Sequence, residues 1–136
     1  MSDDWWIWGV RAAGCFHFVT LALAHRTPIP RGWDENLARL PGIHRRFAIA
    51  QNAAVGGVIA WLGLVCVGFA PLLVGGETMA RLWCAAIALW WGGRLALLPW
   101  LAIKPELTSP LLRWGFRALR LQCGIYGVAF GWLAIR

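Results

Sequence analysis

The sequence has little charge for its length. Charged residues make up 14% of its 136 residues, whereas a soluble domain carries roughly 25%. Hydrophobic residues make up 60%, and a small soluble fold leaves too much of its surface exposed to bury so many. The composition therefore predicts a single domain, residues 1–136, that is surrounded mostly by lipid.

Signatures of enzymes and metal centres are also missing from the sequence. There is no Gly-x-Ser-x-Gly elbow, His-box series, phosphate-binding glycine loop or pair of carboxylates within an apolar run. The cysteines fall singly, one in each of the apolar runs described next, which is typical of small buried side chains. They are Cys15, Cys66, Cys84 and Cys123.

Four apolar runs are each long enough to cross a bilayer, which requires around 20 residues. We predict spans over residues 5–24, 47–74, 79–103 and 111–135, with a loop over 25–46. Barrel strands are excluded because the runs lack an alternating polar period. The expected fold is an all-α, four-helix transmembrane bundle.

The loop over 25–46 holds a candidate for a short helix. Asp34 is a suitable N-cap residue, Glu35 and Arg39 are four residues apart, and Pro41 would end the helix. Trp33, Leu37 and Leu40 would share one face, as expected of a helix that lies in the headgroup layer.

The net charge of +7 follows the pattern of a membrane protein and does not indicate nucleic-acid binding. Cytoplasmic loops collect Lys and Arg, and most of the 13 basic residues lie in or beside the two longer loops. The opposite side has Arg81 and Arg136, with Asp3 and Asp4 before the first span. We therefore expect both termini outside. The nine residues of the cytoplasmic side are Arg26, Arg31, Arg39, Arg45, Arg46, Lys104, Arg113, Arg117 and Arg120.

Each predicted span carries a strong hydrogen-bonding group in its inner half. Polar groups at such depth are costly and are candidates for function. All six acidic residues lie outside the spans, so Arg94 has no carboxylate at its own depth. It could reach inward to Glu106 or a lipid phosphate, join an internal network, or bind an anionic ligand. The predicted polar layer consists of His17, Gln51, Asn52, Arg94 and Gln122.

The histidines are the candidate cofactor ligands. His17 is either a hydrogen-bonded packing residue, a ligand to haem, chlorophyll or a metal, or a proton relay. His25 and His44 fall at facing ends of the first two spans, where they could together ligate a haem or metal, or simply be solvated or face lipid.

Basic residues around the inner helix ends predict binding of anionic lipids, since basic pockets at this level hold such head groups. Cardiolipin or phosphatidylglycerol is the expected ligand. The residues are Arg26, Arg45, Arg46, Arg113, Arg117 and Arg120.

The chain resembles a group of small, functionally uncharacterised bacterial four-helix membrane proteins. The resemblance rests on Trp91-Gly92-Gly93-Arg94 and on the first loop, with Pro30, Trp33, Glu35, Leu37, Leu40-Pro41 and Arg45. It implies a four-helix fold in a bacterial inner membrane and no particular activity.

Small-residue spacings such as Gly127-x-x-x-Gly131 allow close helix packing within or between subunits. With no catalytic set, they favour a non-catalytic subunit that packs within a larger inner-membrane assembly of respiratory or photosynthetic type. The alternatives are an electron-transfer protein that binds haem or chlorophyll through His17 or His25 and His44, and a small transporter or channel that uses the layer around Arg94.

The predicted orientation can be tested with reporter fusions. A fusion at Arg39 should report the cytoplasm and a fusion at Glu77 the outside, because the basic residues gather on the side of Arg39. The same sidedness at both positions would contradict the topology.

Overall fold

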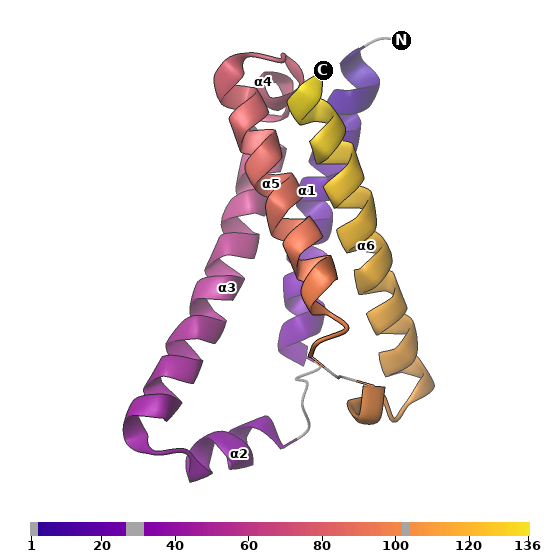
Figure 1. The fold of residues 1–136 in the computed structure, drawn as a ribbon. Coiled ribbons are helices and arrows are strands. Elements are labelled where there is room, and N and C mark those ends of the chain that lie inside the picture. The colour runs from indigo at the N-terminus through magenta and orange to yellow at the C-terminus, as the bar shows by residue number, and fades with distance from the viewer. Residues whose placement is uncertain (1–2, 27–31, 102–103) are drawn as a thin grey trace.

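The computed structural model describes residues 3–26, 32–101 and 104–136, which form helices joined by short connections and contain no strand (Figure 1). The predicted all-α class is therefore confirmed. Residues 27–31 of the predicted first loop, which include Pro30 and Arg31, and residues 102–103 of the predicted third span lie outside the described residues. The elements are α1 (Asp3–Arg26), α2 (Trp33–Arg39), α3 (Gly42–Gly68), α4 (Ala70–Val74), α5 (Thr78–Leu97), the 3-10 helix η1 (Lys104–Glu106) and α6 (Pro110–Ile135).

Three helices of the described chain, α1, α3 and α6, are long and apolar enough to cross a membrane. The 20-residue α5 does not belong to this group. Arg81, Arg94 and three tryptophans lower its hydropathy. The fourth span thus stays a prediction.

The predicted second span is divided into two helices. The helix α3 ends at Gly68, Phe69 leaves the helical conformation with φ −117° and ψ 19°, and α4 follows. Pro71 explains the break, because proline lacks an N–H and its ring clashes with the carbonyl four residues earlier in a continuous helix. It lies in the first turn of α4, where proline is tolerated.

The seven-residue α2 does form in the predicted first loop. Its N-cap is Gly32, in the left-handed region at φ 67°, and Asp34 lies within the first turn instead of capping it. The helix packs against α3 and buries Leu37. Its position in a headgroup layer stays a prediction.

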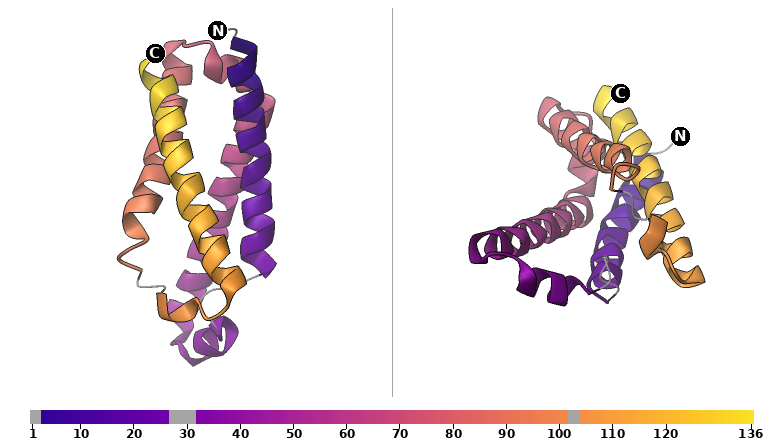
Figure 2. Two further views of the ribbon diagram at one scale, coloured as in Figure 1. Left: turned by 90° about the vertical axis from the view of Figure 1, so that its right-hand side faces the viewer. Right: turned by 60° about the horizontal axis from the view of Figure 1, so that its bottom comes forward.

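The long helices form two pairs, α1 along α3 and α5 along α6. Both termini lie at the end of the molecule that carries α4, and α2 and η1 lie at the opposite end (Figures 1 and 2). The helix α3 diverges from the others toward the α2 end (Figure 1). The side of the membrane that each end faces stays a prediction.

The core occupies the half of the bundle near α4. Its fully buried side chains include Cys66, Cys84, Ile87 and Trp91, which come from α3 and α5. In contrast, every residue of α3 from Gly42 to Ala54 except the half-buried Ala48 is exposed. The bundle is therefore packed at its α4 end and open at its α2 end.

The α4 end is closed by Arg136. Its guanidinium donates hydrogen bonds to the Asp3 carboxylate (3.0 Å) and the Val74 carbonyl (2.8 Å) and lies 5.8 Å from the centre of the Trp6 ring. Arg81 donates a hydrogen bond to the Arg136 carbonyl. These contacts tie α6 to α1, α4 and α5 at the periphery.

Two glycines let α1 and α3 approach closely. A Cβ atom at Gly14 would lie 2.9 Å from both the Gly63 carbonyl oxygen and the Val67 amide nitrogen. A Cβ atom at Gly63 would lie 3.0 Å from the His17 Cβ atom. The backbone itself is the obstacle at Gly14, so any side chain there would force the helices apart.

Gly14→Ala should lower the free energy of unfolding by about 1–3 kcal/mol, the usual cost of overpacking. Thermal unfolding in detergent measures the effect. Gly57→Ala is the matched control, because no atom lies within 4 Å of its added Cβ and the change should be neutral or stabilising by up to about 1 kcal/mol. Equal stability of the two variants would contradict the close approach.

Candidate functional site

Three rings from three helices meet in the core. His17 of α1, Trp91 of α5 and Tyr126 of α6 are buried. The His17 and Tyr126 rings are stacked with centroids 5.0 Å apart, and Trp91 meets each of them edge-on, at 5.1 and 5.3 Å. These separations are typical of favourable ring pairs. We call these three residues the ring cluster.

Hydrogen bonds fix the protonation of His17. The Trp91 Nε1–H group donates to His17 Nε2 at 3.1 Å, and His17 Nδ1 lies 2.7 Å from the Ala13 carbonyl oxygen. Because an indole nitrogen only donates and a carbonyl only accepts, Nε2 must carry the lone pair and Nδ1 the proton. The ring is therefore a neutral imidazole whose two nitrogens are both engaged.

The Ala13 carbonyl also receives a bond from α6. The Tyr126 hydroxyl donates to it at 2.8 Å. This backbone oxygen on α1 thus accepts hydrogen bonds from side chains of two helices. Polar groups in an apolar core are costly unless paired, and each polar group of the ring cluster has a partner.

Metal or haem ligation by His17 would require its Nε2 lone pair, which the Trp91 bond occupies. The geometry therefore favours the packing role among the three interpretations of His17. Among the residues that the structure describes, no group of three His, Cys, Asp or Glu side chains could hold a metal ion.

A second polar set lies one helical turn from the ring cluster, toward the α2 end. The Thr20 hydroxyl lies 2.8 Å from the Gln122 side-chain amide, which joins α1 to α6, and 2.8 Å from the Phe16 carbonyl oxygen of its own helix. Its single proton can serve only one of these two bonds. Three buried nitrogens lack a partner among the described residues: Trp90 Nε1, which is packed against the core, and Arg94 Nε and Gln122 Nε2. The indole and guanidinium nitrogens can only donate, so each of these two requires an acceptor.

The structure does not bring the five residues of the predicted polar layer together. His17 is buried in the ring cluster, and Gln122 and Arg94 are half-buried beyond it. Gln51 and Asn52 are exposed on the part of α3 that diverges from the bundle. The layer is thus divided between the packed half and the open half.

The other candidate histidines lie at the α2 end. His25 is at the last turn of α1 and His44 at the first turn of α3, and both are exposed. Neither side chain has a hydrogen-bond partner within the described chain. Joint ligation by this pair stays a prediction.

The six arginines predicted to bind lipid are all exposed. The structure groups two of them, because Arg117 and Arg120 line a hollow of about 360 Å³ with Leu95 and Leu121. The Arg117 guanidinium lies 5.4 Å from the centre of the Trp114 ring. The other four are Arg26, Arg45, Arg46 and Arg113.

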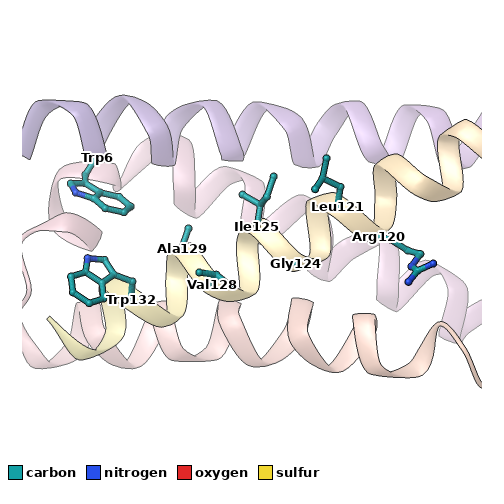
Figure 3. Close-up of a pocket in the computed structure, with 8 residues that line it drawn as sticks. All are labelled: Trp6, Arg120, Leu121, Gly124, Ile125, Val128, Ala129 and Trp132. Carbon is teal, nitrogen blue, oxygen red and sulfur yellow. The ribbon is translucent and has the colours of Figure 1, made fainter.

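An apolar groove of about 770 Å³ continues from this hollow along α6. Arg120 and Leu121 line both spaces. Arg120 lies at one end of the groove, and Trp6 and Trp132 lie at the other (Figure 3). Its remaining lining residues are Gly124, Ile125, Val128 and Ala129.

Trp91 and Tyr126 were not predicted as partners of His17. Their residue types could have indicated that each takes part in a hydrogen bond, because a buried Trp or Tyr usually finds a partner. Which partner it finds depends on how the helices are rotated and paired, and the linear sequence does not state this.

Comparison of the chain with family models, curated proteins and solved structures gives no match in any of the three.

The bond between Trp91 and His17 can be tested by a double-mutant cycle with Trp91→Phe and His17→Phe. Each single change leaves a buried polar group without a partner, so each should destabilise the protein, and the double variant should recover part of the loss. We expect a coupling of about 0.6–1.7 kcal/mol, the range for hydrogen bonds between membrane helices.

Thermal or chemical unfolding in detergent measures the cycle. Trp83→Phe is the control, because Trp83 is exposed on the same helix and should show no coupling to His17→Phe. Additive effects of Trp91→Phe and His17→Phe would contradict the assignment.

Proposed function

We propose that the chain is a non-catalytic subunit of a larger assembly in a bacterial inner membrane, with α1, α3, α5 and α6 as its four spans. The observation that carries this proposal is the open half of α3. A stretch of 13 residues, 42–54, is exposed except for Ala48, on a helix apolar enough to cross a membrane. A partner span would cover this surface.

The face of α3 that is buried near α4 continues into its open half. Ile59 and Cys66 are buried, and Asn52 lies seven residues before Ile59, which places it on the same helical face. Asn52 and its neighbour Gln51 are nevertheless exposed. Amides that face lipid are costly, so a partner that hydrogen-bonds them would be favoured over acyl chains.

Arg94 indicates the chemistry of this partner. It lies seven residues after the fully buried Ile87 and is therefore on the core face of α5. Its Nε donor has no partner among the described residues. A partner span with an acceptor, such as a carboxylate or an amide oxygen, fits both this cation and the exposed amides of α3.

The helix α5 is proposed as the fourth span because of its packing. It lies along α6, and its 20 residues extend about 30 Å, the thickness of a hydrocarbon core. Arg81 is near one end, where it bonds the Arg136 carbonyl. Arg94 is near the other, in the last turn of the helix.

The proposal can be tested with Gln51→Leu combined with Asn52→Leu, analysed by blue-native electrophoresis of native membranes and mass spectrometry of the bands. If the amides bond a partner, loss of two bonds of about 0.6 kcal/mol each should weaken the assembly roughly five- to tenfold. The free subunit should then appear at low mass. Its own thermal stability should not fall, because both side chains are exposed.

Asn36→Leu is the control, because it removes an exposed amide of α2, outside the spans. Migration of the wild-type chain as a free subunit, or unchanged assembly of the double variant, would contradict the proposal.

A further inference from the structure

The groove and hollow along α6 form a continuous site whose two ends differ in chemistry. The hollow presents Arg117 and Arg120, and no acidic residue lines either space. Apart from Arg120, the groove is lined by apolar side chains. We propose that this surface binds one anionic phospholipid, with its phosphate at the two arginines and an acyl chain in the groove.

Charge and donor geometry favour a phosphate at the hollow. The two guanidinium groups present forked N–H donors that match phosphate oxygens. Arg117 lies over the Trp114 ring, and such stacking uses the face of the guanidinium and leaves its N–H edge available. A zwitterionic head group would bring a third cation to a site that already holds two, so an anionic lipid is the better fit.

The length of the groove favours an acyl chain. From Arg120 to Trp132 the helix rises 12 residues, or about 18 Å. This length is sufficient for the roughly 15 Å of hydrocarbon that an acyl chain contributes to one leaflet. Trp6 and Trp132 close the far end of the groove (Figure 3).

Gly124 makes room for the chain in the middle of the groove. A Cβ atom there would have no other atom within 4 Å, so the space beside it is open and faces the groove. Larger side chains at this position would occupy the groove without disturbing the helix packing. This surface belongs to α6, whereas the proposed partner face belongs chiefly to α3, so the two proposals can fail separately.

The full-length protein, equilibrated with equal amounts of phosphatidylglycerol and phosphatidylcholine and examined by native mass spectrometry, should retain one phosphatidylglycerol in preference. Arg117→Gln with Arg120→Gln should weaken this binding about 30-fold, the expected loss for two surface arginines. Arg45→Gln with Arg46→Gln, also exposed but outside the hollow, should retain the lipid.

Gly124→Leu tests the groove separately from the charge. It should reduce lipid retention, whereas Gly57→Leu, another helical glycine with open space around it, should not. Inorganic phosphate and a six-carbon-chain phosphatidylglycerol should fail to displace the bound lipid. Equal retention of phosphatidylcholine, unchanged retention by Gly124→Leu, or displacement by inorganic phosphate would overturn the proposal.

Discussion

The carbonyl oxygen of Ala13 and the imidazole of His17 together connect the two helix pairs. Trp91 of α5 donates to the imidazole and Tyr126 of α6 donates to the carbonyl, and both acceptors belong to α1. Each donor is buried where no water can replace its partner, so the cost of separating the pairs includes the desolvation of both groups. This constraint sets the rotation of α1, α5 and α6 about their own axes.

The approach of α1 to α3 determines where His17 can lie. The space that a side chain at position 63 would take is next to the His17 Cβ atom, 3.0 Å away. Glycine at this position therefore lets α1 pack closely against α3 while the His17 imidazole points toward α5 and α6. The ring cluster depends on Gly63, because a wider spacing between α1 and α3 would move His17 relative to Trp91.

Length and hydropathy were sufficient to predict the helices, and depth along the first span was sufficient to single out His17. The pairing of Gln122 with Thr20 was not predicted. Both residues had the right type and depth, but their contact depends on the rotation of α1 and α6. The break at Phe69 was not predicted either, since a proline in an apolar run, such as Pro71, can kink a helix or end it. Local sequence thus indicated where the helices form, whereas the hydrogen-bond partners of their side chains depend on tertiary packing.

The division of the polar residues follows from where the helices converge. In the packed half, the donors of the ring cluster find acceptors on α1, because Trp91 of α5 and Tyr126 of α6 lie within hydrogen-bond distance of it there. One turn away, Arg94 keeps a donor without a partner in the described chain, and farther along α3 the amides of Gln51 and Asn52 are exposed. Unmet hydrogen-bonding capacity therefore increases toward the α2 end, as packing decreases. In a soluble protein water would meet this demand, but if α3 and α5 span a bilayer, as proposed, it would require acceptors from a neighbouring chain. The ring cluster is satisfied by its own residues, and the open half is the part of the surface suited to a partner.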